Sequence, residues 1–495
     1  MLYWDKLLKA SRFRGASSVP KTASDTRSPF KKDFDTVCNS TVLRRLQDKA
    51  QVFPLEREDY ARTRLTHSIE VLSVAGSLAV QAKKVILSDL EDYLSDEYKQ
   101  QPNSIETIKS LIDDIPTILN TSALLHDMGN PPFGHLGEQI IRDWFTENLP
   151  RIAVDTNGSY VYKDNCTATD SLAYKLKGQF ADDLKNFEGN AQLLRLVTKL
   201  SYVVDENGMN LSFPVLASFI KYPCSSTKIN PGKLSTKKAG YYASEEKAFA
   251  RINSELGLNN CRHPLAYLLE AADDIAYLSA DIEDAQHKGL ISVDFLEQRL
   301  LKENDPKDDA IDRVIHQIEQ YRGDAIKRNY VDDVDGYIIH RLRVFIKGIM
   351  IDAMDEAFKN AYPDIMAGTF EHELIEISGV AGLAKVLRNI EKERIYYSKE
   401  IVESKTRAVT VIRKLLNEYV PAVLNYNEKD KGKDTSNNLL YQSLSLNYRF
   451  ICESTNAEEK DESRILYNRL LLVTDQISGM TDTHALTVYQ TITAS

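Results

Sequence analysis

Apolar residues recur at three- and four-residue spacing along most of the chain, which is the period of an α-helix with one buried side. The segments that show this period are 64–90, 104–127, 190–203, 264–285, 293–301, 336–360, 371–390, 399–424 and 464–477. Strand-like alternation of apolar and polar residues is rare and short. The sequence therefore predicts an all-α fold.

Several loops stand out between these helices because they are rich in Gly, Asn, Ser and Lys. They are 154–165, 224–240 and 425–438, and we expect the last to be the most mobile. There is no internal repeat, and the clearest boundary follows residue 300, where the motif-bearing helices end. This pattern divides the chain into three parts, which are an N-terminal extension (1–40), a motif-bearing core (41–300) and a C-terminal helical region (301–495).

Composition narrows the class of protein. The chain has 495 residues, which is long enough to bury a large core without disulfides. Its five cysteines are scattered, with no CxxC spacing, so we expect a reducing cytoplasm and no cysteine zinc site. We find neither a signal peptide nor an apolar run of about 18 residues, and expect no membrane span. A net charge of −10 disfavours a protein that coats duplex DNA, although a local basic groove is compatible with it.

One stretch, SALLHDMGNPPFGH, ends a predicted helix with His126 and Asp127. Gly129 is a typical C-terminal stop, and Pro131 and Pro132 prevent the helix from continuing. Beside a groove, a metal placed between the histidine and the aspartate can bind both. The alternative is a helix-terminal histidine that contacts its own carbonyl groups, and for one isolated His-Asp pair this alternative is the more frequent.

Two other segments carry polar residues on amphipathic helices. In RTRLTHSIEVLSVAG (62–76), Arg64 and His67 lie three residues apart and therefore face the same side. Taken alone, this pair fits a core histidine beside a surface arginine. The segment FEGNAQLLRL (187–196) places Asn190 and other polar residues at the start of a helix. Because both segments occur together with the His-Asp pair, a role in one shared site becomes the favoured interpretation of each.

A polar stripe runs along the predicted helix 268–285. Asp273, Tyr277 and Asp281 follow one another at four-residue spacing and share one face. Such a stripe is usually solvated, but the flanking residues here are Leu, Ile, Ala and Tyr, which indicates a buried helix. Buried carboxylates need a metal or a hydrogen-bond donor.

Together, His67, His126, Asp127 and Asp273 form a mixed nitrogen and oxygen ligand set. Such a set suits Mn, Fe, Co, Ni or Zn better than calcium, and Mg is compatible with it although Mg prefers more oxygen ligands. Water bound to such an ion is far more acidic than bulk water, so hydroxide becomes available near neutral pH. The set thus predicts a hydrolytic metal site.

These residues reproduce the H…HD…D pattern of the HD-domain phosphohydrolases. The surrounding segments are more specific, and from about residue 40 to 482 they resemble the bacterial deoxyguanosine triphosphate triphosphohydrolases. The segments are RRLQDKAQVFPLE (44–56), RTRLTHS (62–68), HDMGNPPFGHLGE (126–138), FEGNAQ (187–192), GYYASEE (240–246), EAADDIAY (270–277) and ISGMTD (477–482).

The resemblance implies a helical HD-domain enzyme that cleaves dGTP to deoxyguanosine and inorganic triphosphate, by attack of a metal-activated water at the α-phosphate. The cofactor would be a divalent metal ion, first of all manganese or magnesium, with Co, Ni, Fe or Zn as alternatives. The family also implies a cytoplasmic homo-oligomer, expected to be a hexamer, and for some members binding of single-stranded DNA.

The resemblance also assigns roles to individual residues. The metal ligands would be His67, His126, Asp127 and Asp273. The catalytic pair near the α-phosphate would be His135 and Glu138. The substrate contacts would be Gln51, Arg64, Asn190, Lys221, Tyr222, Tyr277 and Asp281. Within this set, Arg64 and Lys221 would contact phosphates, and a tyrosine packed against C2′ would exclude a ribose 2′-hydroxyl.

Some positions depart from the family pattern. Ala50 stands where threonine is common, Asn186 where histidine is common, and Gln476 where an aromatic residue is usual. These departures leave the ligand set intact but leave strict guanine preference open. Two alternatives therefore stand beside a dGTPase. One is an HD-type phosphohydrolase for other dNTPs or other nucleotides, and the other is a non-catalytic protein that binds nucleotides or single-stranded DNA.

Overall fold

The computed structural model describes residues 1–14, 25–55, 61–164, 166–201, 205–303, 309–329, 332–427 and 433–494. Helices dominate these residues, whose one small sheet pairs two short antiparallel strands, β1 (Ile152–Val154) and β2 (Tyr160–Tyr162). The prediction of an all-α fold is confirmed.

The helices fall on both sides of the predicted boundary at residue 300. Those that begin before it are α1 (Trp4–Leu7), α2 (Pro29–Cys38), α3 (Thr41–Arg45), α4 (Arg64–Ser88), α5 (Asp96–Lys99), α6 (Ser104–Ile112), α7 (Ile115–Leu125), α8 (Gly134–Asn148), α9 (Leu172–Lys175), α10 (Phe180–Lys185), α11 (Gly189–Arg195), α12 (Phe213–Phe219), α13 (Glu246–Leu256), α14 (Pro264–His287) and α15 (Val293–Glu303). Those that follow are α16 (Asp309–Lys327), α17 (Val334–Ala367), α18 (Ala381–Ile390), α19 (Lys399–Asn425), α20 (Ser436–Ser443), α21 (Leu446–Asn456), α22 (Glu462–Ser478) and α23 (Asp482–Thr493).

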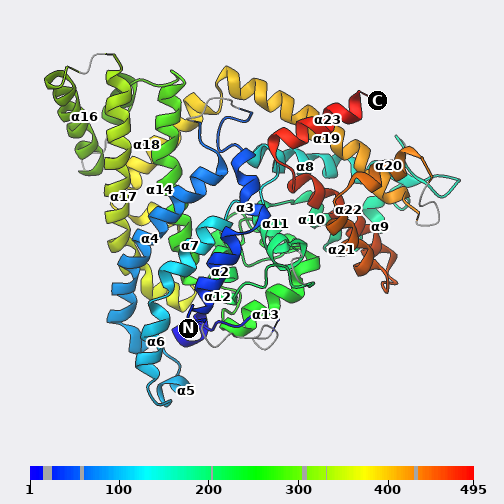
Figure 1. Ribbon diagram of the computed structural model, residues 1–495, viewed down its shortest axis with the longest axis horizontal. Coiled ribbons are helices and arrows are strands. Elements are labelled where there is room, and N and C mark those ends of the chain that lie inside the picture. Colours follow the sequence, from blue (N-terminus) through cyan, green and yellow to red (C-terminus); the bar gives the residue numbers. More distant parts are fainter. Residues whose placement is uncertain are drawn as a thin grey trace.

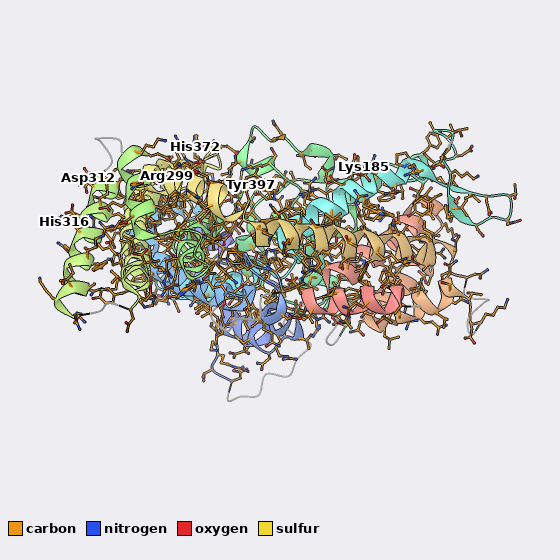
Figure 2. The ribbon with its side chains drawn as sticks, turned by 90° about the horizontal axis from the view of Figure 1, so that it is seen from above. Lys185, Arg299, Asp312, His316, His372 and Tyr397 are labelled. Atoms are coloured by element: carbon orange, nitrogen blue, oxygen red, sulfur yellow. The ribbon has the colours of Figure 1, made fainter. Side chains whose placement is uncertain are left out.

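The C-terminal helices lie at both ends of the molecule. Figure 1 shows α16 and α17 at one end and α20 to α22 at the other, with α4, α7 and α11 between them. Seen from above, Asp312 and His316 of α16 mark the first end (Figure 2). One hydrophobic core runs through all parts, from Trp4 through Ile118 to Leu470. The C-terminal helices thus share the core of the motif-bearing helices, and the three-part division remains a prediction.

The centre of the fold is a group of long helices around α4. Among the described helices, α4 is the one that is long and apolar enough, by length and composition alone, to cross a membrane. It packs against α7, α14 and α17, and the side chains of Arg64 and His67 are buried in its first turns. Its apolar residues therefore build the core that positions these two polar side chains.

The stop after α7 differs from the prediction. Gly129 does not adopt the left-handed conformation of a helix-ending glycine; that conformation occurs at Phe133 (φ 63°) and Gly134 (φ 58°). A Cβ on Gly129 would lie 2.0 Å from the Gly189 carbonyl oxygen and 2.5 Å from the Leu193 nitrogen. Glycine is thus required at 129 by close packing of the loop against α11.

Other predicted segments also differ in detail. The predicted loop that begins at residue 154 contains β2 and the turn that joins it to β1, because its Thr-Asn-Gly-Ser sequence forms the turn. The predicted helix 371–390 is helical in its second half as α18, because the chain becomes extended at Ser378. Parts of three predicted helices and loops lie outside the described residues, and these are 165, 202–203 and 428–432. The expected mobility of 425–438 therefore stays a prediction.

Candidate active site

The four predicted metal ligands come from three helices and meet at one point. His67 lies in the first turns of α4, His126 and Asp127 follow α7 directly, and Asp273 lies in the middle of α14. His67 Nε2 is 3.0 Å from Asp273 Oδ1, and His126 Nε2 is 3.5 Å from the same oxygen and 3.6 Å from Asp127 Oδ2. The ligating atoms of His67, His126 and Asp127 all lie within 4.8 Å of one another.

This geometry fits a divalent ion. Ligand atoms that bind one ion at about 2.0–2.2 Å lie roughly 3.0–3.6 Å from one another, and the three pairs His67–Asp273, His126–Asp273 and His126–Asp127 lie in this range. The His126 Nδ1–H donates to the Ala123 carbonyl oxygen at 2.7 Å. This bond fixes the ring and leaves Nε2 as the nitrogen with a free electron pair. His126 Nε2 is buried and makes no hydrogen bond with any residue that the structure describes. The helix-end contact considered above as an alternative is therefore compatible with ligation, because it orients the ring.

Cations beside the two aspartates keep them ionised. Burial opposes the charge on Asp127, but nearby positive charge, first of all that of Arg64, outweighs it and holds the pKa of Asp127 below its usual range. Arg64 Nη1 donates to Asp127 Oδ2 at 2.7 Å. In the same way, Lys221, 3.2 Å from Asp273 Oδ2, outweighs burial and holds the pKa of Asp273 well below its usual value. Ionised carboxylates are the form that binds a metal.

The predicted catalytic pair lies at the start of α8. His135 Nδ1 is 3.1 Å from Glu138 Oε2, and the histidine side chain is 78% exposed whereas that of Glu138 is 1% exposed. The hydrogen bond and charge of Glu138 raise the pKa of His135. Glu138 also accepts a hydrogen bond from the Gly189 N–H at 2.8 Å. A fixed carboxylate thus orients an accessible, readily protonated imidazole.

The turn before α8 connects this pair to the ligand set. Phe133 and Gly134 both have a left-handed backbone. A Cβ on Gly134 would lie 2.3 Å from Arg64 Nη2, so the turn rests directly on the guanidinium that contacts Asp127. The position of His135 is therefore tied to Arg64 through the packing of a single turn.

A second group of charges surrounds Glu138. Glu188, at the start of α11, accepts from Asn190 Nδ2 at 2.9 Å and lies 3.1 Å from Lys238 Nζ. Burial and the neighbouring Glu138 raise the pKa of Glu188. Tyr222, next to Lys221, is buried against the loop 224–240, where a Cβ on Gly240 would lie 1.6 Å from the Tyr222 carbonyl oxygen. The structure thus brings Asn190 to the catalytic pair and Lys221 to the ligand set.

The stripe on α14 leads away from the ligands into a buried polar region. Tyr277 OH accepts from Arg388 Nε at 3.2 Å. Asp281 is 3% exposed, its Oδ1 has no hydrogen-bond partner among the residues that the structure describes, and burial followed by Asp284 raises its pKa to about 8. The Gln51 Oε1 is also buried, with no partner in the described part of the chain. Buried polar atoms of this kind call for a ligand, a water or another explanation.

Two residues of this region were missed by the sequence-based prediction. Glu391 begins the π-helical turn that follows α18, is 2% exposed, and has an Oε1 for which the described ranges of the chain offer no hydrogen-bond partner. Burial and the neighbouring Asp281 raise the pKa of Glu391. Arg388 contacts Asp274 at 3.0 Å as well as Tyr277. The charge-rich sequence RNIEKERIYY is typical of a solvated helix end, so no signal in it indicated burial.

The chain is similar over almost its whole length to curated bacterial proteins. It is 39% identical over 491 residues to the deoxyguanosinetriphosphate triphosphohydrolase-like protein of Listeria innocua, with 98% of each chain covered. It is 33% identical over 512 residues to the deoxyguanosinetriphosphate triphosphohydrolase of Salmonella typhimurium, with 98% of this chain and 97% of the relative covered. No known protein-family model matches the chain.

Proposed function

The chain belongs to the deoxyguanosinetriphosphate triphosphohydrolase family, which makes it a hydrolase, and on this premise we propose that it hydrolyses dGTP to deoxyguanosine and inorganic triphosphate. The observation that carries the proposal is the convergence of His67, His126 and Asp127 within 4.8 Å. Basic side chains beside these ligands, Arg64 and Lys221, suit an anionic substrate.

We propose that His67, His126, Asp127 and Asp273 hold a divalent metal ion, Mn²⁺ or Mg²⁺ before the other divalent ions. Such an ion supplies Lewis-acid activation of the attacking water and neutralises phosphate charge. The protein would then have to place the α-phosphate between the ligands and the catalytic pair. Arg64 is suited to this because its guanidinium lies between Asp127 and the turn that precedes His135.

His135 is proposed to protonate the departing 5′-oxygen of deoxyguanosine. The Glu138 carboxylate favours the protonated imidazole, which is the form needed by a general acid. Because Glu138 is buried and held by the Gly189 N–H, the imidazole keeps one orientation while its other face stays accessible. Attack on the α-phosphate with departure of the 5′-oxygen yields the nucleoside and triphosphate.

We further propose that the buried polar region beyond Tyr277 takes the nucleoside. Tyr277 would pack against C2′ and Asp281 would accept a hydrogen bond from the 3′-hydroxyl. Guanine presents donors on its N1 and N2 atoms, and the partnerless Glu391 Oε1 and Gln51 Oε1 are acceptors. Asn190 and Tyr222 would complete the pocket nearer the phosphates. Guanine preference would follow, since adenine offers no N1–H.

Several expectations follow from the family resemblance alone, and we propose them on that basis. The protein would be a cytoplasmic homo-oligomer, expected to be a hexamer, and a local groove would bind single-stranded DNA. The net charge of −10 restricts any such groove to a small basic area. A binding titration at several salt concentrations tests it, because DNA affinity falls steeply with salt.

Product analysis tests the proposed function. The purified protein is incubated with Mn²⁺ or Mg²⁺ and each of the four dNTPs or GTP, and the products are separated by chromatography. Deoxyguanosine and triphosphate are expected from dGTP. Formation of dGMP and pyrophosphate, or no turnover of any nucleotide, contradicts the proposal. Equal turnover of all four dNTPs would support the broader phosphohydrolase.

A further inference from the structure

The segment 478–482, which joins α22 to α23, contacts two loops of the candidate active site. Asp482 is 2% exposed, and each of its carboxylate oxygens accepts one backbone hydrogen bond. Oδ1 accepts from the Phe133 N–H at 2.9 Å, and Oδ2 accepts from the Ala50 N–H at 3.0 Å. One side chain thus joins two backbone segments that are more than 80 positions apart in the sequence.

The first of these bonds holds a strained turn. Phe133 has a φ of 63°, a left-handed backbone that is unfavourable for a residue with a side chain. Such a conformation persists only where the surroundings fix it. The turn determines where α8 begins, and therefore where His135 and Glu138 lie. A hydrogen bond that holds the Phe133 N–H therefore also holds His135 and Glu138 in position relative to the metal ligands.

The second bond holds the segment that leads into α4. Ala50 pairs with Thr63 in an antiparallel bridge, and the Arg64 N–H donates to the Lys49 carbonyl oxygen at 2.8 Å. The first turns of α4 carry Arg64 and His67. Asp482 therefore stabilises the backbone on the ligand side of the site as well as on the catalytic side.

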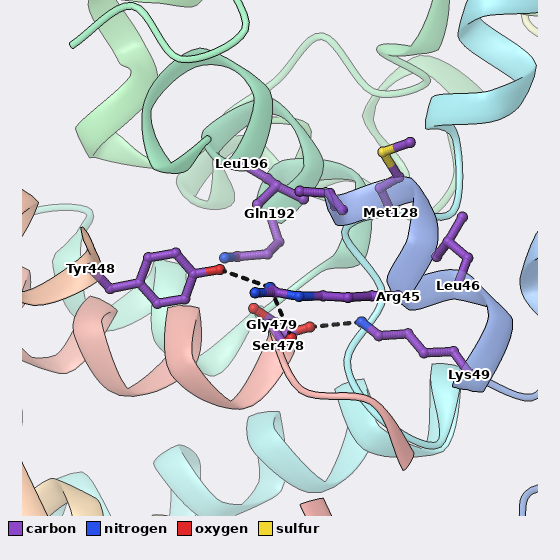
Figure 3. A pocket seen from close by; sticks show the side chains of 10 residues that line it. Arg45, Leu46, Lys49, Met128, Gln192, Leu196, Tyr448, Ser478 and Gly479 are labelled. Atoms are coloured by element: carbon purple, nitrogen blue, oxygen red, sulfur yellow. Dashed lines mark hydrogen bonds between the residues drawn. The ribbon is translucent and has the colours of Figure 1, made fainter. Parts of the chain in front are cut away.

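Neighbouring basic side chains attach the same segment in a second way. Lys49 Nζ donates to the carbonyl oxygens of Asn130 at 2.6 Å and of Ser478 at 2.8 Å, and Arg45 donates to the Gly479 carbonyl oxygen at 3.1 Å. Figure 3 shows the contacts of Lys49 with Ser478 and of Arg45 with Gly479, around a small pocket that Met128 also lines. The Asn130 side chain in turn donates to Asp127 Oδ1.

We propose that Asp482 is a positioning residue that aligns the His135–Glu138 turn with the metal ligands by holding the Phe133 and Ala50 N–H groups together. This inference rests on the proposed function, because it takes His135 as the general acid. The C-terminal ISGMTD sequence would therefore act on the reaction without touching the substrate.

The test is Asp482→Asn. The amide has almost the same shape but one acceptor oxygen, and its NH₂ group faces a backbone N–H, so one of the two bonds is lost. A displacement of about 1 Å at a reacting group can lower the rate by about 100-fold. We expect kcat for dGTP to fall by roughly 10- to 100-fold with KM changed less than about twofold. Amide hydrogen exchange in 130–138 and 48–52 should become faster.

Glu462→Gln is the matched control. Glu462 is the first residue of α22, as Asp482 is of α23, so both substitutions remove a negative charge from the same helical position. The Glu462 carboxylate lies 3.8 Å from Lys175, away from the active-site loops. This variant should keep the wild-type kcat and the wild-type exchange in both segments.

The outcomes separate this inference from the proposed function. Absence of triphosphate release by the wild-type protein contradicts the proposed function, whereas the exchange measurements still test the contacts of Asp482. Wild-type kcat in Asp482→Asn overturns the inference, and so does a fall of kcat without faster exchange in either segment. If Asp482→Asn does not fold, amide hydrogen exchange in the wild-type protein tests the inference instead. Rapid exchange of the Phe133 and Ala50 amides would overturn it, because amides that donate to Asp482 should exchange slowly.

Discussion

Gly129→Ala is the most direct test of how the ligand loop packs. A Cβ at this position would lie 2.0 Å from the Gly189 carbonyl oxygen and 2.5 Å from the Leu193 nitrogen, which are both backbone atoms of α11. Ordinary contact begins near 3.4 Å, so the loop and α11 would have to separate by about 1 Å or more. Overpacking of this kind costs roughly 1–3 kcal/mol of unfolding free energy. The same separation would pull Gly189 from Glu138.

We therefore expect Gly129→Ala to lower kcat for dGTP by about 100-fold, measured as triphosphate release, and to lower the free energy of unfolding in urea. Gly348→Ala is the control, because Gly348 lies on α17 with no atom within 4 Å of an added Cβ. Alanine is favoured over glycine inside a helix by about 0.5–1 kcal/mol, so this variant should be slightly more stable and fully active. If both variants behaved alike, the packing argument for Gly129 would be wrong.

Three further predictions concern single side chains. His126→Ala should abolish activity and the bound Mn²⁺ measured by elemental analysis, and a variant that keeps both contradicts the ligand assignment. Tyr277→Ala should raise the kcat/KM for GTP relative to dGTP by about tenfold, because space opens at C2′; an unchanged ratio counts against the steric role. Burial lowers the pKa of Lys49 to about 7 despite the nearby Asp482, so the folded protein favours the neutral amine. Between pH 7 and 10 the lysine is protonated in the unfolded chain and neutral in the folded protein, so the free energy of unfolding rises with pH in this range and falls again as pH is lowered to 7. Lys49→Met lacks this proton, so in urea unfolding the wild type should gain stability relative to the variant by up to about 1.4 kcal/mol per pH unit. A difference independent of pH would refute this.

The long helices could be predicted because the pattern that indicates each of them lies within its own sequence. α4 and α17 bury part of their surface and α14 buries almost all of it, and burial leaves apolar residues at three- and four-residue spacing that the sequence shows directly. The polar stripe of Asp273, Tyr277 and Asp281 was visible for the same reason, since polar residues among apolar neighbours on a buried face are unusual. The roles of these residues came from the family resemblance and remain predictions.

The contacts between distant segments could not be predicted in this way. The bond from Phe133 to Asp482 joins residues 349 positions apart, and nothing in ISGMTD indicates which loop its aspartate meets. Glu391 was missed because its burial depends on the packing of its π-helical turn against α14. The reason for glycine at 129 was misjudged because the restricting atoms belong to α11, 60 positions later. The spacing of apolar residues shows which side of a helix is buried, but it does not show which segment packs against that side.

Hydrogen-bond partners separate structural carboxylates from functional ones where burial does not. Asp183 is 1% exposed and burial raises its pKa to about 6, but it accepts bonds from Ser226, Tyr467 and the Ala243 N–H, so its environment explains it. Asp281 is similarly buried, yet its Oδ1 has no partner among the described residues. A buried acceptor without a partner costs about 1–3 kcal/mol, which a purely structural residue has no reason to keep. A hydroxyl group of a bound nucleoside would satisfy it.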